Sequence, residues 1–454
     1  MIFIQPFLSR HLSPERILIL GFGSTILVGA ALFRHPMAAA KDSLSFIDAL
    51  FTATSAVCVT GLSVRDIGQD FSFAGQMVAL ILFQIGGVGI ITFSTVFFIL
   101  MGRGISFKGR EIVQSTFLHT PRQDLFSILK SILLYSLFFE ALGTFFLWIR
   151  FSHEFSPARA LYQSIFHAVS AFNNCGFSLF SDSLVRYQGD LLVNLTVMIL
   201  IFMGSIGFIV QYEFLSILRG VQKRFSLHAK ITLVTSGILI LLGAFFFYIS
   251  ERNQILQGHP AETQVLISFF QSLTPRTCGF NTVEVGRLMN ATILLLMILM
   301  FIGGSPGSTA GGIKTTSAAL LVLLIWNRLR GNERINIFRR TLPQEVISRT
   351  ISIILASGVT VFFIASVLLL LGERMLPPLE SRHLFVQYLF EAISAFGTVG
   401  LSMGATSSLN SLQKIAIIFL MFAGRLGPLT LAFSISRRVR KEGVRFAEEG
   451  VMVG

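Results

Sequence analysis

Charged residues are scarce in this sequence. Asp, Glu, Lys and Arg make up 13% of its 454 residues, whereas hydrophobic residues make up 53%, and the mean hydropathy is +0.74. Soluble domains contain about 25% charged residues, and a soluble core of this size does not need so much apolar surface. The composition therefore indicates an integral membrane protein surrounded by a lipid bilayer.

Cysteine is also scarce, and its spacing matches no metal-binding motif. The three residues, Cys58, Cys175 and Cys278, are an odd number. Each lies in a glycine-containing loop, so we interpret them as small residues in tight loops rather than as disulfide or redox groups. The sequence also lacks a catalytic triad, a paired acid and base, and a G-x-G-x-x-G motif opening a βαβ unit. We expect no enzymatic activity and no organic cofactor in this chain.

Acidic residues are fewer than basic ones, 23 against 36, and the net charge is +13. The basic residues form short clusters between apolar stretches rather than one patch, which argues against a nucleic acid partner. One cluster contains Arg219, Lys223, Arg224 and Lys230. Loops rich in Lys and Arg stay in the cytoplasm. We expect a multi-pass protein of the cell (inner or plasma) membrane with basic loops and both termini in the cytoplasm.

Apolar stretches and glycine-containing loops alternate along the chain with a period of roughly a quarter of its length. The stretch S-A-F-N-N-C-G-F at 170–177 has counterparts around Gly61, Gly279 and Gly400, and a second small-residue stretch follows each glycine at nearly constant distance. Each quarter contains an apolar span, a shorter apolar segment before the loop, and a second span. The expected repeats are 1–101, 102–219, 220–327 and 328–454, the last with a basic cytoplasmic tail.

The middle segments, at about 44–56, 158–172, 262–274 and 384–396, are shorter than the roughly 20 residues that cross a bilayer. They are typical of re-entrant helices. Non-helical backbone at that depth is tolerated where it is buried in protein or lines a water-filled cavity. The sequence therefore predicts an all-α membrane protein with eight spans and four re-entrant pore loops, arranged with pseudo-fourfold symmetry around a central ion pore.

The glycine of each loop permits backbone dihedrals closed to other residues, which allows carbonyl oxygens to point inward. Such oxygens replace the hydration shell of a cation. The candidate ion-binding filter residues are Val59, Thr60, Gly61, Asn174, Cys175, Gly176, Thr277, Cys278, Gly279, Thr398, Val399 and Gly400.

Two features break the repeat. Arg425 occupies the position of Gly87, Ser205 and Gly304 in the other quarters, which suggests that its side chain enters the pore; alternatively it pairs with backbone carbonyls and supports packing. A proline and several glycines interrupt the second span of the third quarter, where a passive kink is the alternative to a transport site. The candidate gate residues are Gly303, Gly304, Ser305, Pro306, Gly307, Ser308, Thr309, Gly311, Gly312, Lys314 and Arg425, with the role of Lys314 left open.

The repeated order and four motifs resemble the Trk/Ktr/HKT superfamily of potassium transporters, most closely the Ktr-type membrane (pore) subunit. The motifs are S-A-F-N-N-C-G-F at 170–177, R-T-C-G-F-N-T at 276–282, G-G-S-P-G-S-T-A-G-G-I-K-T-T at 303–316 and S-A-F-G-T-V-G-L at 394–401. The resemblance covers nearly the whole chain.

The resemblance implies potassium uptake, with the loop at 303–316 as a movable gate below the filter and Arg425 as a barrier. It also implies a homodimer, sodium stimulation, and control by a cytoplasmic ring of nucleotide-binding (ATP/ADP) subunits. Gly61 favours K+ over Na+, because serine at this position accompanies sodium selectivity in the plant branch. The alternatives are a sodium-selective relative, a secondary transporter of another solute, and a non-transporting membrane scaffold.

Overall fold

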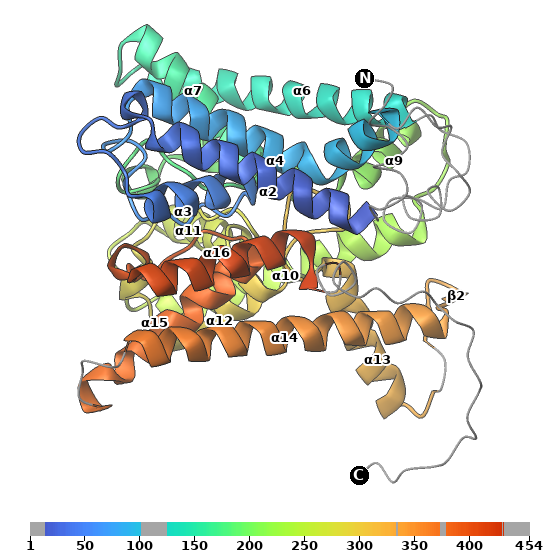
Figure 1. Cartoon of the computed structure of the whole chain (residues 1–454). Helices are drawn as coiled ribbons and strands as arrows, with labels where there is room; N and C mark the ends of the chain where they lie inside the picture. The colour runs from blue at the N-terminus through green and yellow to red at the C-terminus, as the bar shows by residue number, and fades with distance from the viewer. Residues whose placement is uncertain (1–13, 101–124, 333–334, 373–377, 429, 431–454) are drawn as a thin grey trace.

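The computed structural model describes residues 14–100, 125–332, 335–372, 378–428 and 430. These residues form a bundle of α-helices (Figure 1), as the sequence predicts. The helices are α2 (Pro14–Arg34), α3 (Phe46–Val57), α4 (Phe73–Leu100), α6 (Leu125–Phe151), α7 (Pro157–Phe172), α8 (Leu191–Ser205), α9 (Phe208–Leu218), α10 (Leu227–Glu251), α11 (Ala261–Leu273), α12 (Asn290–Phe301), α13 (Thr315–Leu329), α14 (Gln344–Gly372), α15 (Pro378–Gly397) and α16 (Ser411–Leu426). Both termini, the basic tail and the basic loop between the first two repeats, all predicted to be cytoplasmic, lie outside the described residues.

The first helix of a repeat faces outward and the short helix is enclosed. Three helices in the described part of the chain are long and apolar enough to cross a membrane, within Lys130–Phe151, Leu227–Glu251 and Gln344–Gly372. Only 28–33% of the residues in their most apolar stretches are buried inside the protein. In contrast, α3 is buried along nearly its whole length. The long helices therefore present apolar side chains to lipid and surround the short ones.

The short helices α3, α7 and α11 agree closely with the predicted middle segments. The fourth, α15, is longer than the predicted 384–396, because it begins at Pro378 and ends at Gly397.

The second span of the second repeat is broken, whereas the sequence predicts one continuous span there. Helices α8 and α9 meet at an angle of 100°, and Gly207 between them has a φ of 91°. The backbone groups freed by the break bond to the loop between α12 and α13: Ser305 N–H donates to Ser205 O at 2.9 Å, and Phe208 N–H donates to Gly307 O at 2.9 Å. These bonds supply partners for backbone groups that the break leaves without helical ones.

The predicted interruption of the third repeat is present between α12 and α13. Residues Ile302 and Ile313 form an isolated parallel bridge across this loop, and Gly303 N–H donates to Ile313 O at 2.8 Å. The two ends of the loop therefore lie side by side, and α13 begins close to the end of α12. A small antiparallel hairpin of β1 (Asn336–Ile337) and β2 (Arg340–Thr341), which the sequence analysis did not predict, precedes α14.

The first and last repeats are in contact, so the arrangement of helices closes on itself. Lys414 on α16 forms an ion pair with Asp48 on α3 at 2.7 Å. One hydrophobic cluster joins residues of both repeats, including Ala53 and Phe83 from the first and Ile417 and Leu420 from the last. This closure places the four glycine loops around a common centre.

Candidate functional site

The four glycine loops share an unusual backbone. The residue two positions before each glycine has a positive φ, as does the glycine itself: 56° and 86° at Val59 and Gly61, 58° and 75° at Asn174 and Gly176, 98° and 86° at Thr277 and Gly279, 50° and 92° at Thr398 and Gly400. Left-handed backbone is a genuine outlier for branched residues such as Val and Thr. Its recurrence shows that the surrounding structure imposes one conformation on four different sequences.

Backbone amides in these loops turn back toward the short helix. Thr60 N–H donates to Ser55 O and Cys175 N–H to Ser170 O, both at 2.8 Å, and Val399 N–H donates to Ser394 O at 2.9 Å. The third loop differs by one residue, since Cys278 N–H donates to Thr274 O at 2.9 Å. In the described part of the chain no hydrogen bond is made to the carbonyl oxygens of Thr60, Cys175, Cys278 and Val399. The loops thus combine bonded amides with unbonded carbonyls.

The loops form a closed ring in which each glycine faces a carbonyl of the next loop. A Cβ atom on Gly61 would overlap the carbonyl oxygen of Cys175. The same relation links Gly176 to Cys278, Gly279 to Val399, and Gly400 to Thr60. Glycine is therefore required at each position for two reasons, the positive φ and the close approach of a neighbouring backbone. The twelve candidate filter residues come together around one centre.

In three of the four repeats, the second small-residue stretch packs against the short helix of the same repeat. Cβ atoms on Gly86, Gly204 and Gly424 would overlap the carbonyl oxygens of Val57, Phe172 and Phe396, which lie at the C-terminal ends of α3, α7 and α15. This contact explains the nearly constant distance between the two glycine signals in the sequence. The third repeat departs from it, because Gly303 faces Gly311 O instead.

The loop between α12 and α13 lies against three of the glycine loops. Thr309 Oγ1 accepts a hydrogen bond from Asn174 Nδ2 at 2.7 Å. Gly303 lies beside the Thr277 side chain, and Gly311 lies so close to the Thr398 hydroxyl that a Cβ atom there would overlap it. The candidate gate residues are therefore in direct contact with the residues two positions before the filter glycines.

Internal hydrogen bonds fix the shape of this loop. Ser308 Oγ donates to Ser305 O at 2.6 Å, and Ser305 Oγ lies 3.3 Å from Thr315 Oγ1. Lys314 Nζ donates to Ala310 O at 2.7 Å, so its ammonium group bonds within the loop. The remaining gate candidates Gly304, Pro306 and Gly312 lie on the same segment, with Gly304 O accepting from Thr315 N–H at 3.0 Å.

Arg425 is buried, with 3% of its surface exposed. From the fourth repeat it bonds to both the third and the first. Its guanidinium donates to Thr309 O in the loop between α12 and α13, and to Gly86 O at 2.6 Å and Gly87 O at 3.3 Å on α4. The carbonyl pairing considered as an alternative is therefore present. Because one partner belongs to the candidate gate, Arg425 also holds that loop against the first repeat.

Three other buried ionisable residues brace the loops from outside. Arg276, which immediately precedes the third loop, donates to Ser236 Oγ on α10 at 3.0 Å. Glu140 accepts from Asn173 Nδ2 at 3.2 Å beside the second loop. Glu391 accepts from Thr406 Oγ1 at 2.7 Å and also from Ser402, and so fixes the chain after Gly400. Both glutamates thus accept hydrogen bonds from neutral side chains within the bundle.

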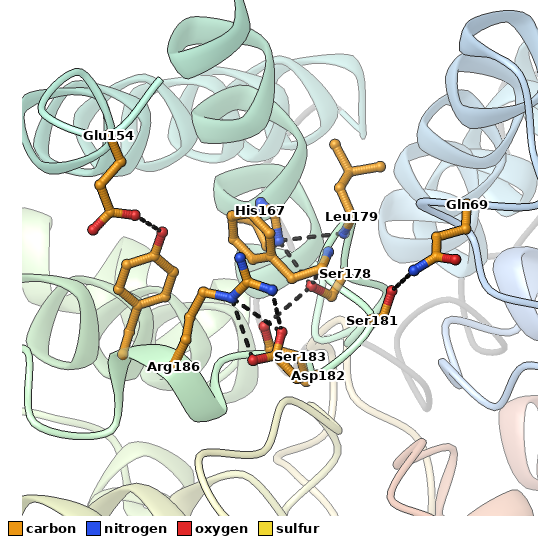
Figure 2. Close-up of polar contacts among 11 residues, drawn as sticks. Gln69, Glu154, His167, Ser178, Leu179, Ser181, Asp182, Ser183 and Arg186 are labelled. Atoms are coloured by element: carbon orange, nitrogen blue, oxygen red, sulfur yellow. Dashed lines mark hydrogen bonds and ion pairs between the residues drawn. The ribbon is translucent and has the colours of Figure 1, made fainter. Parts of the chain in front are cut away.

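His167 organises the chain that follows the second glycine loop (Figure 2). Its Nδ1–H donates to Gln163 O at 2.8 Å, which leaves Nε2 to accept from Leu179 N–H at 3.4 Å. The imidazole stacks on Phe180 with centroids 4.6 Å apart. The histidine therefore has a packing and orienting role.

Polar contacts farther out connect the same segment to its neighbours (Figure 2). Gln69 Nε2 donates to Ser181 Oγ at 2.7 Å, which joins the first repeat to the second. Tyr187 O–H donates to Glu154 Oε2 at 2.7 Å. Burial and the Glu154 carboxylate raise the pKa of Tyr187, so the phenol keeps its proton and remains the donor. The sequence does not predict these pairs, because their partners are far apart along the chain and belong to no recognisable motif.

Comparisons with known proteins agree with this architecture. Ktr system potassium uptake protein B of Bacillus subtilis is 38% identical over 97% of both chains. Potassium/sodium uptake protein NtpJ of Enterococcus hirae is 35% identical over 98% of both chains. The crystal structure of the potassium transporter TrkH from Vibrio parahaemolyticus shares the fold, with a TM-score of 0.74 at 19% identity over 94% of this chain and 86% of that one. Residues 23–441 match the TrkH family, described as cation transport protein, and the chain therefore belongs to that family.

Proposed function

We propose that this protein takes up potassium ions across the cell membrane through the centre of its four repeats. The observation that carries the proposal is the closed ring of glycine loops. In the described residues, each loop has a carbonyl oxygen without a hydrogen-bond partner that lies against the glycine of a neighbouring loop. Carbonyl oxygens in such a ring replace the hydration shell of a monovalent cation. The short helices direct their C-terminal, negative dipole ends toward the same centre.

We assign the filter to the twelve residues of the four loops, from Val59 to Gly61, Asn174 to Gly176, Thr277 to Gly279 and Thr398 to Gly400. The repeat boundaries proposed from the sequence, 1–101, 102–219, 220–327 and 328–454, each enclose one loop and its short helix. Within this scheme the polypeptide acts as a transporter rather than as an enzyme.

We assign the gate to residues 303–314 together with Arg425. Contacts from Thr309 to Asn174 and from Arg425 to Thr309 O support this role, because they hold the loop directly beside the filter. The positive charge of Arg425 also opposes the passage of another cation. Release of these contacts would open the route, and the lack of regular helix in the loop makes such a change possible without unfolding a span.

Potassium is favoured by the names of several relatives and by Gly61 in the first loop. The Enterococcus relative is named for potassium and sodium, so a sodium-selective protein is the second candidate. A secondary transporter of another solute would be expected to show paired discontinuous helices. This chain does have two helix breaks, between α8 and α9 and between α12 and α13. These breaks bond to each other, however, and lie beside a ring of four glycine loops.

The family resemblance further supports a homodimer, sodium stimulation, and control by a cytoplasmic ring of nucleotide-binding subunits. No dinucleotide-binding motif occurs in this chain, so nucleotide control requires another polypeptide. The basic junctions support an orientation in the inner or plasma membrane with these junctions in the cytoplasm.

Potassium uptake in cells that lack their own potassium systems tests the proposal. Expression of this chain with a regulatory subunit should restore growth at low external K+ and net K+ uptake. Failure of uptake, with membrane insertion verified, would contradict the potassium assignment. Addition of Na+ in the same assay distinguishes sodium-stimulated uptake from sodium-independent uptake.

A further inference from the structure

A cavity of about 650 Å³ lies between the turn that joins α9 to α10 and the hairpin that precedes α14. Arg224 and Lys230 line it from the first side, and Arg339 and Arg340 line it from the hairpin. In Figure 1, β2 and α9 lie at the end of the bundle opposite to α7 and α15. Two junctions that are distant in the sequence therefore meet in one strongly basic pocket, away from the glycine loops.

The positive charge of this cavity is not neutralised by the residues that line it. Glu213 is the one acidic residue among them, and its carboxylate accepts a hydrogen bond from Ser226 N–H at 2.9 Å. In the described part of the chain, none of the four cations belongs to an ion pair. Several like charges facing one space attract an anion and repel one another without it.

The turn of the hairpin has an unfavourable left-handed backbone, and the hairpin places Arg339 and Arg340 at the cavity. Its turn residues Phe338 and Arg339 have φ values of 48° and 63°, where Asn and Gly are the usual residues. The Phe338 ring lies 5.8 Å from Lys230 Nζ, across the cavity. The turn thus places an aromatic ring against one cation and a second cation beside it.

The surroundings fit a ligand that combines phosphate with apolar groups. Helix α10, one of the candidate membrane spans, begins at Leu227 on the cavity wall, so the cavity lies at the depth of lipid headgroups. Phe225 and Leu227 add apolar surface to the lining. Arginine guanidinium groups bind phosphate in a bidentate manner.

We propose that this cavity binds a phosphate-bearing anion, with Arg224, Lys230, Arg339 and Arg340 as its ligands. Two sources supply that chemistry at this position, the headgroup of an anionic phospholipid and a soluble phosphate compound. The site is separate from the proposed ion route and does not depend on which cation is transported.

Native mass spectrometry of the purified full-length protein tests the site in two arms, with phosphatidylglycerol and with pyrophosphate. R339Q/R340Q removes two ligands by changing exposed side chains. It should weaken binding about thirtyfold, which corresponds to a contribution of about 1 kcal/mol from each of the two cations near a membrane surface. Lys230→Gln tests the opposite wall. The matched control R328Q/R330Q removes two exposed cations from the end of α13 that do not line the cavity.

Weaker binding of phosphatidylglycerol in the cavity variants, with the control unchanged, assigns the site to a lipid headgroup. The same pattern with pyrophosphate assigns it to a soluble phosphate compound. Equal affinities of the cavity variants and the native protein in both arms would overturn the site. A loss of the same size in the control would also overturn it, because it would reflect general surface charge.

Discussion

At the scale of single residues, the proposed filter depends on backbone that most side chains cannot adopt. Val59, Asn174, Thr277 and Thr398 have left-handed dihedrals without being glycine, and each such residue costs of the order of 1–3 kcal/mol. Each is followed two residues later by a glycine in contact with the next loop. The strain is therefore distributed around the ring and is maintained by packing between repeats.

Arg425→Ala should raise basal cation flux. The substitution removes charge-assisted hydrogen bonds to Thr309 O and Gly86 O and also removes the positive charge beside the filter. Loss of about 1.4 kcal/mol of gate stabilisation would increase flux about tenfold if opening limits the rate. Radiotracer uptake into proteoliposomes measures this effect, and Arg425→Lys, which retains the charge, should lie between the two. Unchanged flux in Arg425→Ala would contradict the barrier role.

At the scale of elements, the proposed gate loop and the break between α8 and α9 form one unit. Each supplies the hydrogen-bond partners that the other lacks, through Ser205 O with Ser305 N–H and Phe208 N–H with Gly307 O. Movement of the loop therefore has to expose or replace backbone groups at the end of α8. This coupling stabilises both breaks, because backbone groups at membrane depth need hydrogen-bond partners.

Deletion of 306–309 should make transport less dependent on a regulatory subunit. The deletion removes the contacts of Thr309 and Gly307 with the second repeat while leaving α12 and α13 intact. Uptake measured with and without the co-expressed regulator should give a smaller ratio than in the native protein. Ser181→Ala, which alters a contact between repeats on the other side of the filter, serves as a control with an unchanged ratio. A native ratio in the deletion variant would exclude the gate assignment.

The helical order and the four loops could be predicted from the sequence, because glycine requirements at matching positions are local and repeated. The break after Ser205 could not. Its apolar sequence contains no proline, and the groups that stabilise the break come from the loop of the next repeat. The hairpin was missed for a similar reason, since Phe338 and Arg339 occupy turn positions that Gly or Asn usually marks.

At the scale of the whole molecule, contacts between the first and last repeats close the ring. The pair Asp48–Lys414 is largely buried, with 11% and 16% of the side chains exposed. The two residues stand at opposite ends of the sequence, so no local pattern indicated their contact. Closure of this kind is needed because the Gly400 loop must meet Thr60 O for the ring of loops to be complete.

Lys414→Met should lower the stability of the folded protein by about 3 kcal/mol, the usual cost of leaving one partner of a buried ion pair uncompensated. Thermal unfolding of the purified protein in detergent measures the effect. Lys41→Met breaks the exposed pair with Asp70, in which the Lys41 side chain is 63% exposed, and should change stability by less than about 1 kcal/mol. Equal effects of the two variants would contradict the role of Lys414 in closure.

Selection of potassium by the ring of glycine loops is tested by the ratio of K+ to Na+ uptake in Gly61→Ser. The added side chain would meet the carbonyl oxygen of Cys175 in a left-handed backbone, so we predict a reduced ratio. Gly358→Ser on α14, where nothing lies within 4 Å of an added Cβ, should retain the native ratio. An unaltered ratio in Gly61→Ser, with uptake intact, would contradict the filter.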